Sequence, residues 1–137
     1  MPPKRRIFLD TGVLIAAATG TDEVAQQAFA ILNDPDAEFA SSVFVRLETI
    51  PHAAYNKRPS EVAFYETFFE SVAAWVESAR ELVDSALEYA SRHDLGAMDA
   101  LHVAAALTCQ ADEIVTTEKP TKPFRRVTTV PVRFISR

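Results

Sequence analysis

Apolar residues along this chain fall into short continuous runs that alternate with longer stretches in which they recur every three or four positions. Short runs are typical of buried strands, and the longer spacing is typical of helices that cover a sheet. We expect strands near residues 7–9, 38–40, 73–76, 113–116 and 127–135. We expect helices near residues 13–18, 22–33, 41–55, 60–72, 79–91 and 97–109, with a kink at Pro51. Helices between successive strands predict an α/β domain with a mostly parallel sheet.

Length and the spacing of glycine and proline indicate a single folded unit. The chain has 137 residues, of which 48% are hydrophobic, and this is enough for a buried core. Only 3 glycines occur, and after the N-terminus the prolines fall singly, so no linker is apparent. We expect one domain over residues 1–137, with residues 1–5 as a loose basic N-terminus.

The sequence shows neither a membrane segment nor a secretion signal. No apolar run approaches the ~18 residues of a membrane span, and the start of the chain lacks the apolar core of a signal peptide. We therefore expect a cytoplasmic protein that makes no use of a membrane. The single cysteine, Cys109, cannot form an internal disulfide and is expected to be a small buried hydrophobe.

The overall charge limits how the protein could bind nucleic acid. Lys and Arg number 14 against 19 Asp and Glu, which gives a net charge of −5. This balance argues against a protein that holds nucleic acid through positive potential alone. A site of carboxylates that holds divalent cations is also counted as negative, so the charge does not exclude a nucleic-acid enzyme.

Asp10 has a position that suggests chemistry. It follows the apolar run Ile7–Leu9 directly and precedes an expected helix. In open α/β sheets, ligands bind at the carboxyl ends of the strands, where this carboxylate would lie. The alternative is that Asp10 only caps the helix, by accepting a hydrogen bond from a backbone N–H of the first turn.

Four acidic residues follow or interrupt otherwise apolar stretches: Asp10, Glu48, Asp99 and Glu118. Burying several ionised carboxylates together is costly unless a cation compensates them. Mg²⁺ and Mn²⁺ prefer oxygen ligands, and a pair of such ions can activate water and stabilise the leaving oxygen of a phosphodiester. The alternative, that these acids are helix caps and surface residues, stays open on spacing alone.

The chain resembles the PIN-domain proteins, and most of all the bacterial VapC-type toxins, over nearly its whole length. Leu9–Thr11 matches the family's opening strand followed by Asp-Thr, and Ser41-Ser42 with Glu48 matches its Ser-rich helix entry with an internal Glu. The most specific match is Asp-Ala-Leu-His-hydrophobic-Ala at residues 99–104. The family's strand ending in Thr-Thr-Asp, then Lys and Phe, is met by Thr116–Lys119 and a later Phe124. Glu118 therefore stands where Asp is usual.

This resemblance implies an α/β/α sandwich, a single PIN-like domain whose mostly parallel sheet lies between helices. It also implies a metal-dependent endoribonuclease that uses Mg²⁺ or Mn²⁺ and hydrolyses RNA phosphodiester bonds with metal-activated water. As a toxin of a type II toxin–antitoxin pair, the protein would have a cognate antitoxin and form a homodimer. The implied catalytic and metal-binding residues are Asp10, Glu48, Asp99 and Glu118, with Thr11 and Thr117 as hydrogen-bonding supports.

Two other functions stay open. One is a catalytically inactive PIN-like module that binds nucleic acid or a protein. The other is a receiver-like phosphoacceptor, because Lys122-Pro123-Phe124 is similar to part of that family, although Asp10 lacks the neighbouring acid that receivers have near their first strand. His102 shares the helix side of Asp99, but in so apolar a helix we interpret it as a packed histidine and leave it out of the metal site.

Two surfaces are candidates for contact with other molecules. Basic residues that could hold RNA phosphates, or that could equally form a solvated rim, are Arg46, Lys119, Lys122, Arg125 and Arg126. The second surface is the expected helix 60–72, whose apolar residues span roughly 160°, broader than the ~100° stripe that one core needs. Phe64 and Phe68 are therefore expected to anchor a partner interface, unless neighbouring helices cover the whole arc.

Overall fold

The computed structural model describes residues 3–120 and 123–135. In these residues, five parallel strands form one sheet in the order β3-β2-β1-β4-β5. The strands are β1 (Arg5–Leu9), β2 (Ala37–Ser42), β3 (Ala74–Val76), β4 (Glu113–Thr116) and β5 (Val132–Phe134). The helices are α1 (Thr11–Thr19), α2 (Glu23–Leu32), α3 (Val43–Tyr55), α4 (Pro59–Ser71), α5 (Ala79–His93) and α6 (Ala97–Thr108), with a short 3₁₀ helix η1 (Pro123–Arg126).

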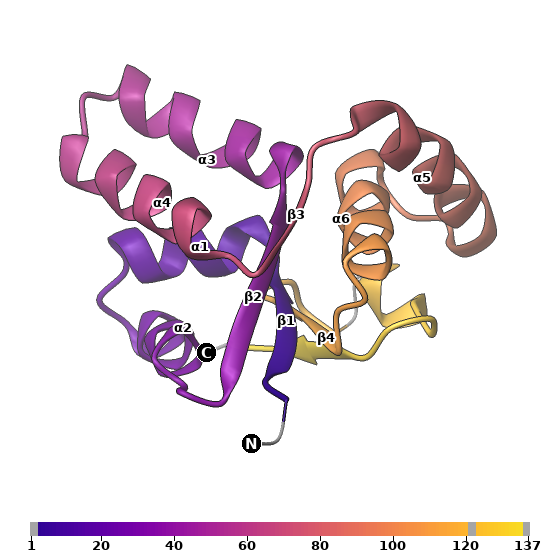
Figure 1. Ribbon diagram of the computed structural model, residues 1–137, viewed down its shortest axis with the longest axis horizontal. Helices are drawn as coiled ribbons and strands as arrows, with labels where there is room; N and C mark the ends of the chain where they lie inside the picture. Colours follow the sequence, from indigo (N-terminus) through magenta and orange to yellow (C-terminus); the bar gives the residue numbers. More distant parts are fainter. Residues whose placement is uncertain (1–2, 121–122, 136–137) are drawn as a thin grey trace.

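The helices cover both faces of the sheet. Figure 1 shows α1 to α4 on one side of the central strands and α5 and α6 on the other. This arrangement is the predicted α/β/α fold with an all-parallel sheet. Among the described residues, no helix is long and apolar enough to cross a membrane. The strand order also differs from the β2-β1-β3-β4-β5 order of flavodoxin-like folds, so it does not support the receiver-like alternative.

Two neighbouring strands, β1 and β4, bury most of their residues. In β1, Ile7, Phe8 and Leu9 are 2%, 0% and 0% exposed, because both faces of a central parallel strand are covered by helices. All of β4 is buried as well. In contrast, β5 is a short strand at the sheet edge that follows Pro131, where a residue without a backbone N–H disturbs the sheet least.

Polar side chains define where several helices begin. Asp22 accepts a hydrogen bond from the Ala25 backbone N–H at the start of α2, and the Ser42 hydroxyl accepts one from Phe44 at the start of α3. These contacts satisfy backbone donors that a helix leaves unpaired in its first turn. Further along, α3 continues through Pro51 to Tyr55. The helix that carries Glu48 therefore reaches its full length despite the proline.

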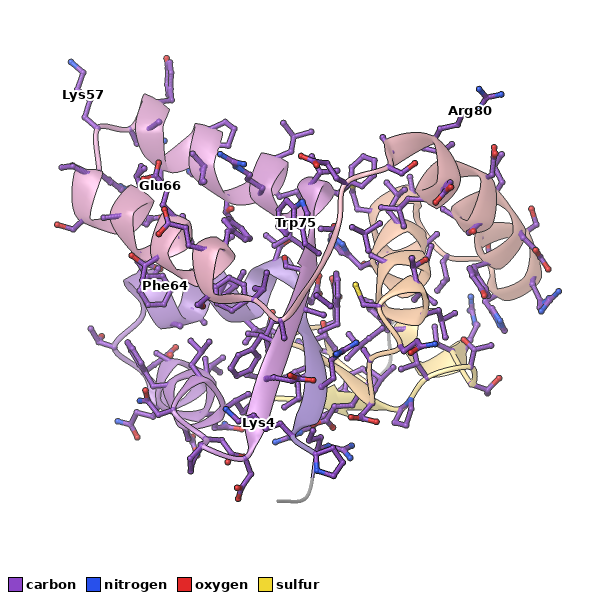
Figure 2. All side chains as sticks on the ribbon, in the orientation of Figure 1. Lys4, Lys57, Phe64, Glu66, Trp75 and Arg80 are labelled. Atoms are coloured by element: carbon purple, nitrogen blue, oxygen red, sulfur yellow. The ribbon has the colours of Figure 1, made fainter. Side chains whose placement is uncertain are left out.

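The aromatic helix α4 is covered more completely than its sequence suggests. Tyr65 is fully buried, and its hydroxyl donates a hydrogen bond of 2.7 Å to Glu61. Phe68 is only 6% exposed and packs against Phe39 of β2, with ring centroids 6.0 Å apart. At Phe68 the alternative considered from the sequence holds, because α1 and α3 pack against α4 and the sheet lies beneath it, so Phe68 is not an exposed interface anchor. Phe64 remains partly exposed, on the side of α4 that faces α2 (Figure 2).

Candidate active site

The sequence-predicted acids come from four different elements that meet at one end of the sheet. Asp10 follows the last residue of β1, and Glu118 lies two residues beyond the end of the neighbouring strand β4. Glu48 is in the second turn of α3, and Asp99 is in the first turn of α6. Since β1 and β4 are adjacent and parallel, their carboxyl ends share the same edge, where open α/β sheets bind their ligands.

Asp10 is fixed at both of its carboxylate oxygens. Its Oδ1 accepts a hydrogen bond of 2.9 Å from the Thr11 backbone N–H, which is the helix cap considered from the sequence. Its Oδ2 accepts a hydrogen bond of 2.8 Å from the Thr116 hydroxyl. With only 7% of its surface exposed, Asp10 is both a helix cap and a buried member of the acidic site. The two interpretations are therefore compatible.

Glu48 is held through one oxygen by two donors. The Thr11 hydroxyl lies 2.7 Å from Glu48 Oε1, and His102 Nε2 lies 2.8 Å from the same oxygen. His102 Nε2 is also 3.5 Å from Asp10 Oδ1. The hydrogen bond from His102 is the main reason why the pKa of Glu48 lies below its usual range, with the Thr11 hydroxyl adding to it against the effect of burial. Glu48 is thus ionised and oriented.

Asp99 carries the opposite perturbation. Burial raises its pKa to about 6, and the negative charges of Asp10, Glu118 and Glu48 add to the effect, while His102 opposes it. Among the described residues, no hydrogen bond is donated to the Asp99 carboxylate. The site therefore concentrates negative charge around Asp99 without a cationic side chain that fully balances it.

Thr116, and not Thr117, is the threonine that supports the acids by hydrogen bonding. Its hydroxyl donates to Asp10 and accepts a hydrogen bond of 3.0 Å from the backbone N–H of Glu118. Thr117 instead packs against the first turn of α1, where a Cβ on Gly12 would lie 2.2 Å from Thr117 Oγ1. The expectation that Thr117 bonds the acids is therefore corrected to Thr116, whereas Thr11 supports them as expected.

The residues at the site suit a divalent cation by their chemistry. The donor set consists of carboxylate oxygens, the ligand type that Mg²⁺ and Mn²⁺ prefer. Within the described ranges, no three His, Cys, Asp or Glu side chains already stand close enough together to enclose a metal ion. A preformed cage is not required, because Mg²⁺ is usually bound through one or two carboxylates and keeps several waters. The charge and the donor type of these residues therefore fit a divalent cation.

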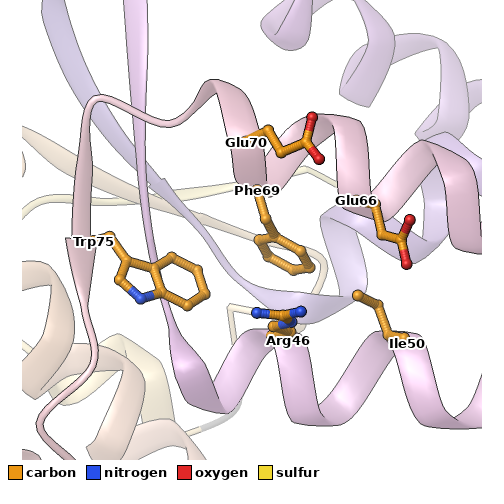
Figure 3. A pocket seen from close by; sticks show the side chains of 6 residues that line it. All are labelled: Arg46, Ile50, Glu66, Phe69, Glu70 and Trp75. Carbon is orange, nitrogen blue, oxygen red and sulfur yellow. The ribbon is translucent and has the colours of Figure 1, made fainter.

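Arg46 lies apart from the acids, although it is close to Glu48 in sequence. Figure 3 shows its side chain beside Phe69 of α4 and Trp75 of β3. These residues line a pocket of about 210 Å³. Two positions along a helix are separated by about 200°, so Arg46 and Glu48 point to nearly opposite sides of α3. The structure therefore does not bring Arg46 to the acidic site.

The other predicted basic residues have different surroundings. Lys119 is exposed and lines a groove with Gly12 and Thr117, beside the acidic site. The Arg126 guanidinium instead lies 3.4 Å from the His93 carbonyl oxygen, at the end of α5. Lys122 and the side chain of Arg125 lie outside the part of the chain that the structure describes. Of the predicted phosphate-binding residues that are described, only Lys119 adjoins the acids.

Two residues of the site were not predicted from the sequence. His102 was interpreted as a packing residue, and it is indeed 1% exposed, but its Nε2 faces Glu48 and Asp10. The available signal was its position three residues after Asp99, which places both side chains on one side of α6. Thr116 could be found only from the pairing of Leu9 with Val115, which puts Asp10 beside it.

Comparison with known proteins adds a family and a shared fold. The family model of the PIN domain matches residues 7–128. A comparison with curated protein sequences gives no match. Among solved structures, the chain resembles VapBC2 from Rickettsia felis, bound to a DNA fragment from their promoter, with a TM-score of 0.70 at 15% identity, over 95% of this chain and 98% of that chain.

Two further structures are similar over most of their length. Mycobacterium tuberculosis VapC20, described as a Sarcin-Ricin loop cleaving toxin, has a TM-score of 0.64 at 20% identity, over 79% of this chain and 86% of that chain. VapBC-1 from nontypeable Haemophilus influenzae has a TM-score of 0.68 at 18% identity, over 94% of this chain and 97% of that chain. At these identities the likeness establishes a common fold.

Proposed function

Because the chain belongs to the PIN domain family, we propose that it is a metal-dependent endoribonuclease that acts in the cytoplasm as the toxin of a type II toxin–antitoxin pair. The observation that carries the proposal is the meeting of Asp10, Glu48, Asp99 and Glu118 at the carboxyl end of the sheet. The raised pKa of Asp99, caused by burial and by the other three acids, marks negative charge that a cation would neutralise.

The chain's own residues have separate roles in this proposal. Asp10 and Glu48 are fixed by hydrogen bonds before any ligand binds, so they offer preoriented oxygens to the ion. Asp99 and Glu118 lack such fixing of their carboxylates among the described residues and can adjust to it. Lys119 has the proposed role of binding a phosphate of the RNA backbone, which is supported by its exposure in a groove beside Thr117.

Mg²⁺ or Mn²⁺, held by these carboxylates, would supply positive charge at the phosphate and lower the pKa of water for attack. In the hydrolysis, a water oxygen forms a new bond to phosphorus while the bond from phosphorus to the 3′ oxygen breaks. The water proton passes to solvent or to a carboxylate of the site. The departing 3′ oxygen becomes a hydroxyl, and the other fragment keeps the phosphate.

The proposal predicts cleavage that depends on the ion and on Asp99. Purified protein with Mg²⁺ or Mn²⁺ should cut structured RNA, and an excess of chelator should stop it. Asp99→Asn should abolish cleavage while the circular dichroism spectrum stays unchanged. The control is Asp84→Asn, which removes the same charge from an exposed position on α5 and should cleave like the wild type. Full activity in chelator, or in Asp99→Asn, would exclude the proposed nuclease.

Partner binding is the second part of the proposal. The similar structures from Rickettsia felis and Haemophilus influenzae are of VapBC proteins, which supports an antitoxin partner for this chain as well. A homodimer is proposed on the resemblance to VapC-type toxins. Phe64 is the residue of α4 that we retain as an interface candidate, since it is partly exposed and lines a groove of about 380 Å³ between α2 and α4.

A further inference from the structure

Among the residues that the structure describes, the buried His102 makes its polar contacts with two acids of the site. It lies 1% exposed on α6, with its ring 5.9 Å from that of Phe8. Its Nε2 contacts Glu48 Oε1 at 2.8 Å and approaches Asp10 Oδ1 at 3.5 Å. Its Nδ1 is buried and has no hydrogen-bond partner among the described residues.

This pattern of contacts is unlike that of a histidine kept only for packing. A buried polar group normally has its donors and acceptors satisfied, and an apolar side chain of similar size would fill the same space without that requirement. His102 instead leaves one nitrogen unsatisfied and directs the other to Glu48, which is 54 positions away in sequence. An ionised carboxylate only accepts hydrogen bonds, so Nε2 must carry the proton of this contact.

We propose that His102 is a positioning residue that orients Glu48 for metal binding. Together with the Thr11 hydroxyl, it occupies Glu48 Oε1 with two donors. Glu48 Oε2 accepts no hydrogen bond from any described residue, so it is the oxygen left for the ion or for one of its waters. The inference rests on the proposed function, since it assigns His102 a role in that same site.

The same geometry explains why His102 is placed on α6. Asp99 precedes it by three residues, so one helix carries both a carboxylate of the site and the donor that orients another carboxylate. A shift of α6 would move the two groups together. Glu48, on α3, is thereby held in a fixed relation to Asp99, although neither side chain bonds to the other in the described structure.

Two amide variants separate positioning from packing. In His102→Gln, the side-chain nitrogen reaches about as far as the histidine Nε2 and can still donate to Glu48. In His102→Asn, the amide reaches only as far as Nδ1, so the donor to Glu48 is lost while the residue stays polar. Both variants remove the aromatic ring, so a loss of packing affects them alike.

The experiment measures Mn²⁺ binding by calorimetry at fixed pH, together with the kcat and KM of RNA cleavage. We expect His102→Asn to weaken Mn²⁺ binding about 10- to 100-fold and to lower kcat, as is usual when a group that orients a ligand is removed. We expect the Mn²⁺ affinity and the kcat of His102→Gln to stay within a few-fold of the wild-type values. Thr11→Val removes the second donor to Glu48 Oε1. If both residues act through this oxygen, Thr11→Val should weaken Mn²⁺ binding less in the His102→Asn protein than in the wild type.

The outcomes distinguish the inference from the function on which it rests. If the wild-type protein neither binds Mn²⁺ nor cuts RNA, the proposed nuclease is excluded. If the wild type does both and the two variants bind Mn²⁺ equally well or equally poorly, His102 does not act through its hydrogen bond to Glu48, and the inference is overturned. Should His102→Asn fail to fold, a His102→Gln protein with wild-type binding supports the positioning role, and one with weak binding refutes it.

Discussion

Asp99→Asn should make the metal-free protein more stable at neutral pH than the wild type. The pKa of Asp99 is raised from 3.8 to about 6 in the folded protein, by burial and by the charges of Asp10, Glu118 and Glu48. The folded state therefore binds this proton more tightly than the unfolded chain does. Stability from the protonated carboxyl is fully present below about pH 4 and is lost as the pH rises through about 6. Above that pH, the ionised Asp99 destabilises the fold.

The size of the effect follows from the pKa difference. One pKa unit corresponds to about 1.4 kcal/mol, so the shift sets an upper limit of about 3 kcal/mol. Asp99 is only partly buried, and solvent screens part of its repulsion with the other acids, so we expect about 1 to 2 kcal/mol. Asparagine has nearly the same shape and no charge, so it removes the repulsion and leaves little cavity.

Urea unfolding in chelator, followed from pH 4 to pH 8, measures this difference. The stability advantage of Asp99→Asn over the wild type should grow as the pH rises from about 4 to about 6 and then level off, whereas the stability of Asp84→Asn, changed at an exposed position, should follow that of the wild type. Saturating Mg²⁺ should stabilise the wild type more than Asp99→Asn, because the ion binds the folded site and neutralises it. The reasoning fails if Asp99→Asn is less stable than the wild type in chelator at pH 7.5, or if the difference does not change with pH.

Three further predictions test particular contacts, each with a matched pair of substitutions. Glu118→Ala should weaken Mn²⁺ binding, measured by calorimetry, and slow RNA cleavage. Glu118→Asp, which introduces the residue usual in the family, should keep or improve both. If the alanine variant is as active as the wild type, the other three acids suffice. Thr116→Val removes the hydroxyl that donates to Asp10 and should lower the free energy of unfolding, measured with urea, by about 1 to 3 kcal/mol. Thr117→Val should lower it clearly less. Phe64→Glu should stay folded and reduce dimer mass or antitoxin affinity, whereas Phe68→Glu buries a charge and should fail to fold in circular dichroism.

The order and type of the elements could be predicted from the sequence because apolar periodicity reports burial directly. The apolar run Ile7–Leu9 at the end of β1 and the buried pair Ile114 and Val115 in β4 mark strands in the chain, and both strands were predicted. The helices 79–91 and 97–109 were placed within two residues of α5 and α6. β2 was predicted too short, because its last residues, Ser41 and Ser42, are polar but buried.

The candidate acids could be predicted and their supporting residues could not, for a physical reason. An acid that follows an apolar run, as Asp10 does, or interrupts one, as Asp99 does, is conspicuous in a sequence. Whether Thr116 or Thr117 reaches Asp10 depends on the register between two strands more than 100 residues apart. The exposure of Phe68 likewise depends on how α1 and α3 pack over α4, and this packing cannot be predicted from the periodicity of α4 alone.

The way the acids are anchored implies that they respond differently to a metal ion. Asp10 accepts a hydrogen bond at each carboxylate oxygen, and Glu48 accepts two at one oxygen, so much of their negative charge is already compensated by the fold. Asp99 has no such donor among the described residues, and burial, together with the charges of the neighbouring acids, raises its pKa. A bound ion should therefore stabilise the ionised carboxylate of Asp99 more than those of Asp10 and Glu48. Asp10 and Glu48 should keep their positions on metal binding, because Thr11, Thr116 and His102 already orient the carboxylates that would hold an ion.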